Sequence, residues 1–128
     1  MVLVDTCGWI EWLTAGPLAK RYEPLLSQTG DLLVPTLVQF ELYKWVCRER
    51  DEPTALEVIG VTEQGTVVPL DTSLALQAAD LAAAHRLAMA DAIIYATARQ
   101  HDAELVTSDS HVQHLPGVTY FSKNDKEQ

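Results

Sequence analysis

The chain has 128 residues, a length typical of one domain, and 48% of them are apolar. Nine Lys and Arg against 18 Asp and Glu give a net charge of −9, which argues against a protein that coats nucleic acid by charge alone, because such binding needs a basic face. No apolar run reaches the ~18 residues of a membrane span, and the N-terminus lacks the basic segment of a signal peptide. Two cysteines make no disulfide framework. We therefore expect a cytoplasmic protein without membrane association.

Short β-branched and leucine-rich runs predict the strands of a sheet. The runs are continuous rather than alternating, which suits parallel strands that are buried on both faces. We predict strands over residues 2–4, 32–34, 66–70, 105–107 and 118–121.

Longer helical stretches lie between these runs. Thr36 is followed three residues later by Gln39, and Thr54 by Glu57, so each pair has the spacing of a capping box at a helix start. Asp71 opens an alanine-rich stretch that extends to about residue 86, and a further helix is expected over about 90–100. Strands that alternate with helices imply crossover connections. The predicted fold is therefore a three-layer α/β/α sandwich with a central, mainly parallel sheet, in one domain over residues 1–121 with a polar tail over 122–128.

Three acidic residues directly follow predicted strands: Asp5, Asp71 and Asp109. Ligands of open parallel sheets bind outside the carboxyl ends of the strands, so each residue is a candidate for a functional site. Each is equally well placed to be a helix N-cap, and for one such residue alone that structural role is the better interpretation.

Two further acidic residues fall on helices where a solvated carboxylate is not expected. Around Glu41, the neighbours on the same helix face are Leu37, Val38 and Trp45, so Glu41 lies on an apolar face. Asp91 opens a helix that is apolar nearly all round, where it could also serve as an N-cap. A buried carboxylate without a partner is costly, so Glu41 in particular calls for a functional explanation.

Several carboxylates at one sheet edge repel each other, and their pKa values rise unless a cation holds them. The sequence offers no buried basic cluster for that purpose. Carboxylate and water oxygens are the ligands that Mg²⁺ and Mn²⁺ prefer. An acid-only site of this kind is typical of phosphoryl-transfer chemistry, in which the ion activates water and offsets phosphate charge.

The other polar residues point to no competing site. The four histidines lack zinc-type spacing with the cysteines and are expected at the surface, and Cys7 has no neighbouring histidine to activate it as a nucleophile. Lys44, Arg48 and Arg50 form a short basic cluster after Glu41. We interpret this cluster as a solvated helix C-terminus that complements the helix dipole, slightly in preference to a substrate contact.

With these residues assembled, the chain resembles PIN-domain ribonucleases, specifically the VapC-type toxins of bacterial and archaeal toxin–antitoxin pairs. The likeness runs from Leu3 to Phe121 and rests on four acidic motifs in order. The motifs lie at residues 3–11, 35–42, 87–94 and 105–109, the last followed by the similar segment 115–118.

The resemblance implies an endoribonuclease that hydrolyses a phosphodiester bond in single-stranded or loop RNA with Mg²⁺ or Mn²⁺. It also implies a homodimer and a cognate VapB-type antitoxin whose C-terminal segment enters the active-site groove. The metal ligands and catalytic residues implied by the four motifs are Asp5, Glu41, Asp91 and Asp109, with Thr6 and Thr107 in supporting positions.

The sequence departs from the family pattern at two positions. Cys7 stands where the family often has Ser or Asn, which weakens a supporting hydrogen bond. His111 stands where a further acidic residue is common, which puts a second metal ion in doubt.

Two alternative functions remain. A receiver-type signalling domain would use Asp5, Asp71, Thr107 and Lys123, but receivers carry two adjacent acidic residues after the first strand, and they give no role to Glu41. The second alternative is a PIN-like module that binds RNA or a partner without cleavage, although all four acidic residues are present.

Overall fold

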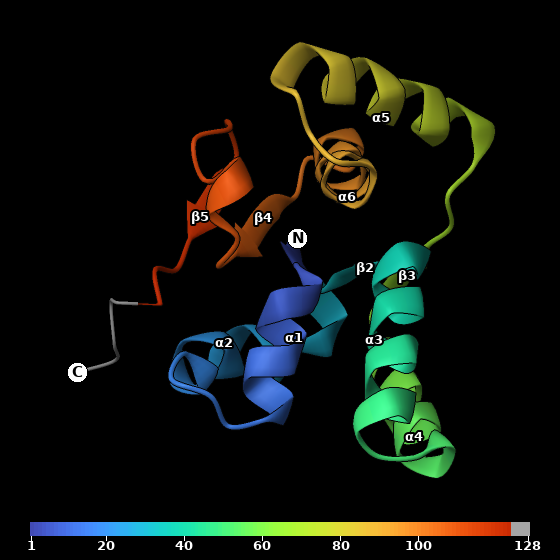
Figure 1. Cartoon of the computed structure of the whole chain (residues 1–128), viewed down its shortest axis with the longest axis vertical. Helices are drawn as coiled ribbons and strands as arrows, with labels where there is room; N and C mark the ends of the chain where they lie inside the picture. Colours follow the sequence, from blue (N-terminus) through green and yellow to red (C-terminus); the bar gives the residue numbers. More distant parts are fainter. Residues whose placement is uncertain (124–128) are drawn as a thin grey trace.

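The computed structural model describes residues 1–123, so residues 124–128 of the predicted tail lie outside the described residues. Each of the first three strands is followed by a pair of helices, and the last two strands follow each other without an α-helix between them (Figure 1). The strands are β1 (Val2–Val4), β2 (Leu33–Pro35), β3 (Thr66–Val68), β4 (Glu104–Thr107) and β5 (Val118–Tyr120). The helices are α1 (Thr6–Leu13), α2 (Ala19–Leu26), α3 (Thr36–Glu49), α4 (Glu52–Thr62), α5 (Thr72–His85) and α6 (Met89–Gln100).

The strands form a parallel sheet in two parts. One part has the order β1-β4-β5 and the other pairs β2 with β3, and every pair is parallel. A single parallel bridge between Val2 and Leu32 joins the parts, which gives the spatial order β3-β2-β1-β4-β5. All five predicted strands are present; β1 has the predicted ends, and the other four have ends shifted by at most two residues.

Helices cover both faces of this sheet, so the predicted three-layer α/β/α architecture is confirmed. In Figure 1, α6 and α5 lie on one side of the strands, and α1 and α2 lie on the other. Helix α6 contacts β2 and β4, whereas α5 packs on α6 rather than on a strand. Helices α3 and α4 form a hairpin beside β2.

The two capping boxes predicted from the sequence are wrong. Helix α3 is capped by Pro35 without a side-chain hydrogen bond, because the Gln39 amide turns away and donates to Thr62 Oγ1 at 3.0 Å. Helix α4 begins earlier than predicted, because Asp51 accepts a hydrogen bond from the Thr54 backbone N–H at 2.8 Å and takes the N-cap position. Asp71 does cap α5, as predicted, by accepting from the Leu74 N–H at 2.9 Å.

Helices α1 and α2 were not predicted from the sequence. Each is eight residues long, and α2 carries Pro24 in its interior, so neither gives a long periodic pattern. Helix α1 packs closely on the core at Gly8, where an added Cβ would lie 2.6 Å from Val4 Cγ1 and still closer to the Tyr22 ring. A glycine is therefore required for α1 to approach β1 and α2.

The core around β1 and β4 is apolar, and its side chains are shielded from solvent. Leu3, Val4, Trp9 and Leu105 are fully or almost fully buried in a single cluster around β1 and β4. Within residues 1–123, no helix is both long and apolar enough to cross a bilayer.

Candidate active site

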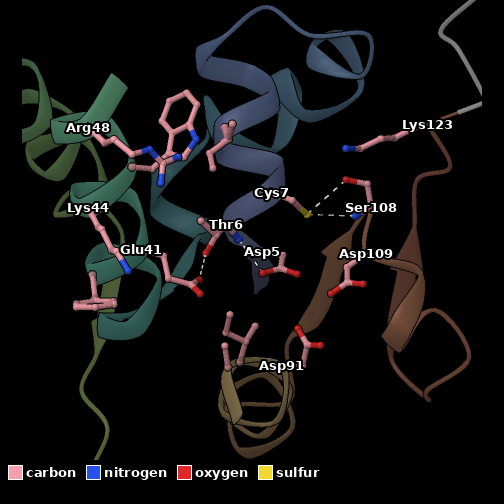
Figure 2. A pocket seen from close by; sticks show the side chains of 15 residues that line it. Asp5, Thr6, Cys7, Glu41, Lys44, Arg48, Asp91, Ser108, Asp109 and Lys123 are labelled. Atoms are coloured by element: carbon pink, nitrogen blue, oxygen red, sulfur yellow. Dashed lines mark hydrogen bonds between the residues drawn. The ribbon is translucent and has the colours of Figure 1, made fainter. Parts of the chain in front are cut away.

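A cavity of about 550 Å³ opens at the carboxyl ends of β1 and β4. All four acidic residues predicted for the site line it: Asp5, Glu41, Asp91 and Asp109. They come from four separate parts of the chain, and Figure 2 shows their side chains converging from different elements on the same space. Asp71, the other acidic residue at a strand end, does not line the cavity and serves as the N-cap of α5.

Asp5 is the most buried of these carboxylates, with 8% of its surface exposed. It directly follows β1 and caps α1, where its Oδ1 accepts from the Thr6 N–H at 2.8 Å. The Thr107 hydroxyl donates to its Oδ2 at 2.8 Å. Burial raises the pKa of Asp5, and although the hydrogen bond from Thr107 opposes the shift, the nearby charges of Glu41 and Asp109 add to it.

Asp91 and Asp109 lie next to each other in the cavity (Figure 2). Asp91 lies in the first turn of α6, whose N-cap is Ala88, so its alternative interpretation as an N-cap is wrong. Burial and then the charge of Asp109 raise the pKa of Asp91 to about 6. Asp109 does have a capping role, because its Oδ1 accepts from the His111 N–H at 2.9 Å in a short 3₁₀ turn.

Glu41 enters the cavity from α3. It is half-buried, and its Oε1 accepts from the Thr6 hydroxyl at 2.5 Å. Thr6 therefore links the Asp5 strand end to the second acidic motif through its backbone and its side chain. This contact gives the Glu41 carboxylate a hydrogen-bond donor, although the helix face around it is otherwise apolar.

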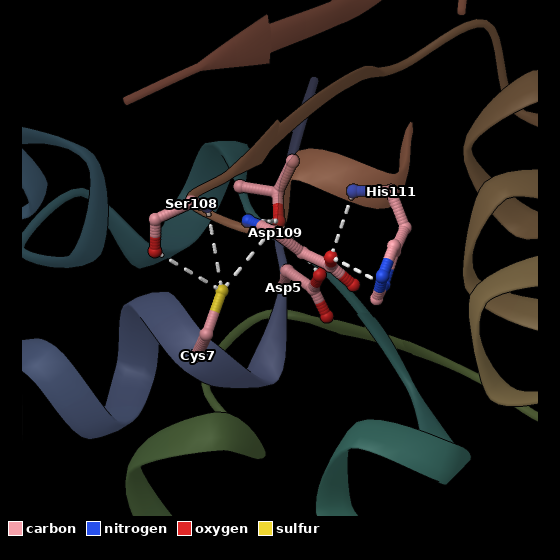
Figure 3. Close-up of polar contacts among 6 residues, drawn as sticks. Asp5, Cys7, Ser108, Asp109 and His111 are labelled. Atoms are coloured by element: carbon pink, nitrogen blue, oxygen red, sulfur yellow. Dashed lines mark hydrogen bonds and ion pairs between the residues drawn. The ribbon is translucent and has the colours of Figure 1, made fainter. Parts of the chain in front are cut away.

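His111 is exposed, as predicted, and it lies beside the acidic cluster. Its exposed ring places Nδ1 3.1 Å from Asp109 Oδ1 (Figure 3). Ligand atoms of Asp91, Asp109 and His111 all lie within 4.8 Å of one another, which is close enough to share one ion. The sequence placed His111 two residues after Asp109, where a further acidic residue is common in the family, but gave no sign that its ring would approach Asp91.

Cys7 lies beside this centre but is poorly suited to act as a nucleophile. Figure 3 shows its sulfur accepting hydrogen bonds from Ser108, whose N–H and hydroxyl both lie 3.4 Å away. Burial and the Asp5 charge raise the pKa of the thiol. The thiol therefore stays protonated at neutral pH, and its contacts with Thr107 and Ser108 join α1 to the end of β4.

Positive charge lies on the rim of the cavity. Lys44 and Arg48 line the cavity from α3, and Lys123 lines it from the opposite side, as Figure 2 shows. Arg50 is directed elsewhere and is not among the lining residues. The basic cluster that the sequence analysis interpreted as one solvated helix end is thus divided by the fold.

Comparison with known proteins identifies the family. The family model of the PIN domain matches residues 2–118. The chain belongs to the PIN-domain family. No curated protein sequence matched significantly.

Solved structures with the PIN fold superpose on nearly the whole chain. A toxin–antitoxin complex from Klebsiella pneumoniae is 22% identical with a TM-score of 0.80, and the alignment covers 93% of this chain and 96% of that one. VapBC2 from Rickettsia felis, bound to a promoter DNA fragment, is 13% identical with a TM-score of 0.73, covering 95% and 100%. The sarcin-ricin loop cleaving toxin VapC20 from Mycobacterium tuberculosis is 19% identical with a TM-score of 0.68, covering 84% and 87%. At these identities, the likeness establishes the fold of this PIN domain.

Proposed function

We propose that this PIN domain is a Mg²⁺- or Mn²⁺-dependent endoribonuclease and the toxin of a VapBC-type toxin–antitoxin pair. The observation that carries the proposal is the convergence of Asp5, Glu41, Asp91 and Asp109 on one open cavity at the carboxyl edge of the sheet. Family membership and the similarity to toxin structures support the same function.

The donor set fits a hard divalent cation. Four carboxylates line the cavity. The pKa values of Asp5 and Asp91 are raised first by burial and then by the charges of neighbouring carboxylates, which a bound cation would offset. Asp91 and Asp109 would hold the ion together, with Asp5 beside them and Glu41 on the α3 side. When bound, Mg²⁺ or Mn²⁺ supplies an activated water at neutral pH and offsets the phosphate charge.

The protein groups fix the geometry that hydrolysis requires. Thr107 and the backbone of Thr6 hold both oxygens of Asp5, so this carboxylate cannot rotate freely. The Thr6 hydroxyl orients Glu41 in the same way. A phosphodiester entering the open cavity would therefore meet oriented acceptors, and these would place the attacking water and receive its proton.

We also propose the partners of this site. The similar structures from Klebsiella pneumoniae and Rickettsia felis are toxin–antitoxin complexes, which supports a cognate VapB-type antitoxin as a binding partner. The homodimer rests on family membership alone. An antitoxin arginine could pair with two carboxylate oxygens of the cavity at once and so inhibit cleavage.

The receiver-type alternative is wrong. Receivers have the strand order 2-1-3-4-5, whereas this sheet has the order β3-β2-β1-β4-β5. Asp71, which that alternative needs beside Asp5, caps α5 outside the cavity.

The decisive experiment is incubation of the purified chain with total RNA in Mg²⁺ or Mn²⁺, with and without a chelator, followed by mapping of new 5′ ends. We expect discrete cleavage that the chelator abolishes. Asp91→Asn should abolish cleavage, and Asp71→Asn is the matched control, because Asn caps a helix nearly as well as Asp.

Specific RNA binding without any metal-dependent cleavage would contradict the nuclease proposal and favour the non-cleaving PIN-like alternative. Cleavage that survives Asp91→Asn would exclude this carboxylate from the site.

A further inference from the structure

Three side chains form a line along the rim of the cavity on α3. Phe40, Lys44 and Arg48 are spaced four residues apart, so they lie on neighbouring turns of one helix face, and all three line the cavity. We call them the α3 stripe. The buried residues Val38 and Leu42 are each two positions from a stripe residue, so the stripe lies roughly 200° around the helix from the core.

The side chains of the stripe are available to a ligand. Phe40 is 60% exposed, although it is a large aromatic residue in an acidic cavity. The Lys44 ammonium lies 5.9 Å from the centre of its ring. The Arg48 side chain is 61% exposed, and its Nε forms an ion pair with the adjacent Glu49 Oε2 at 3.1 Å on the surface. Pairs of that kind contribute little, so the Arg48 guanidinium remains available to an anion.

The distribution of charge singles out the same rim. The chain has a net charge of −9 and nine Lys and Arg, of which eight fall within residues 1–123. Three of those eight, Lys44, Arg48 and Lys123, line this cavity. Cations on both sides of the carboxylate cluster can attract the backbone of an anionic chain that crosses the cavity. At the carboxylates themselves, a phosphate is repelled unless a metal ion lies between them.

We propose that the α3 stripe binds the RNA strand beside the scissile phosphate, with one unpaired base stacked on Phe40 and successive phosphates contacted by Lys44 and Arg48. The proposal rests on the proposed nuclease function and names the substrate form that the site selects. Lys44 and Arg48 are separated by about 6 Å along the helix axis, which is comparable with the spacing of neighbouring phosphates in an extended strand.

Selection for single strands follows from this geometry. An exposed aromatic ring beside cations is the usual platform for single-stranded nucleic acid, because every base presents a flat face once it is unstacked. A base that is paired and stacked within a duplex cannot reach the Phe40 ring. The stripe therefore favours loops and unpaired segments over helical RNA.

The test measures binding and cleavage separately. Binding of a fluorescent single-stranded oligoribonucleotide is followed by anisotropy in the Asp91→Asn background, which prevents cleavage, over a range of salt concentrations. We expect Phe40→Ala to weaken binding by roughly 5- to 150-fold, the usual value of one stacked base. Lys44→Ala and Arg48→Ala should each reduce the salt slope, d log K/d log[salt], by about 0.7.

Controls distinguish specific contacts from general charge. Arg50→Ala removes the same charge from the same helix end but outside the cavity, and it should leave the salt slope unchanged. Phe40→Trp should retain or strengthen binding, and binding of a fully paired duplex should be insensitive to Phe40→Ala. In the cleaving protein, the stripe variants should raise KM and leave kcat unchanged.

The proposal is overturned if the stripe variants bind the single strand as tightly as their background, or if Arg50→Ala has the same effect as Arg48→Ala. It is also overturned if the variants change only the dimer or the affinity for the antitoxin, since the stripe would then be a protein interface. Failure of the proposed nuclease function has a different outcome from failure of the stripe proposal. In that case the wild-type chain would not cleave RNA, while the stripe variants would still alter RNA binding.

Discussion

The Thr107 hydroxyl donates a hydrogen bond to Asp5 Oδ2 at 2.8 Å and accepts one from the Asp109 N–H at 2.9 Å. This completely buried hydroxyl thereby connects the first and fourth acidic motifs, which are about a hundred residues apart in the sequence. The contact with Asp5 also opposes the rise in the pKa of that carboxyl caused by burial.

Thr107→Val should therefore weaken metal binding without changing the fold. The substitution keeps the side-chain shape but leaves the Asp109 N–H without its acceptor, at a cost of about 1–3 kcal/mol in the free energy of unfolding. The pKa of Asp5 should rise further. Calorimetric titration with Mn²⁺ at pH 7 measures the affinity, and Thr107→Ser, which keeps the hydroxyl, should bind as the wild type does. Equal affinity for Thr107→Val would exclude the hydroxyl from control of the site.

Asp5→Asn should abolish RNA cleavage and leave the metal-free protein as stable as the wild type, or more stable. Asn retains an oxygen for the Thr6 N–H, and it removes a buried charge that Glu41 and Asp109 repel. Thermal denaturation without metal, together with the cleavage assay, tests both parts. A large loss of stability would show that Asp5 is principally structural.

Asp91 should contribute to the pH dependence of the metal-free protein, because its pKa is raised to about 6 from an ordinary 3.8. Between these values the folded chain binds more protons than the unfolded chain, so the stabilisation from protonated Asp91 is lost as pH rises from about 4 to about 6. Asp91→Asn should remove this contribution. Urea denaturation of both proteins at pH 4.5 and pH 7 should show the variant gaining relative stability at the higher pH; a constant difference would contradict the raised pKa.

Affinity for single-stranded RNA should rise steeply with Mg²⁺ concentration. The net charge of −9 opposes RNA binding, and each divalent ion adds two positive charges where a phosphate must enter. Anisotropy with a non-cleavable single-stranded RNA analogue in the Asp71→Asn protein and in the Asp5→Asn protein, with Mg²⁺ at constant ionic strength, compares an intact carboxylate cluster with an impaired one. The Mg²⁺ dependence of the affinity should be strong in the first protein and weak in the second. Equal dependence would show that Mg²⁺ acts only by general screening of the repulsion between the protein and RNA.

The sequence predicted the elements that depend on local patterns. Continuous apolar runs located all five strands, and the strand ends located Asp5 and Asp109, because side chains that follow parallel strands share one edge of a sheet. Glu41 was found because a carboxylate on an apolar helix face requires an explanation.

Features that depend on tertiary packing could not be predicted in this way. The approach of α1 at Gly8 and the redirection of Gln39 toward α4 are decided by neighbours distant in the sequence. The direction of Lys44 and Arg48 follows from how Val38 and Leu42 seat α3 on the core, which fixes the rotation of the whole helix. The meeting of His111 with Asp91 depends on a turn and a helix that join only in the folded chain.

The bridge between Val2 and Leu32, which joins the two parts of the sheet, has a consequence for the dynamics of the site. Glu41 follows the part that contains β2, whereas Asp5 and Asp109 follow the part that contains β1 and β4. An ion held by carboxylates from both parts would connect them and so stabilise the junction between β1 and β2, which has only this one bridge. Hydrogen exchange of the backbone amides of β1 and β2 should then slow when Mn²⁺ is added. The rate of local opening at this junction would therefore depend on whether an ion occupies the cavity.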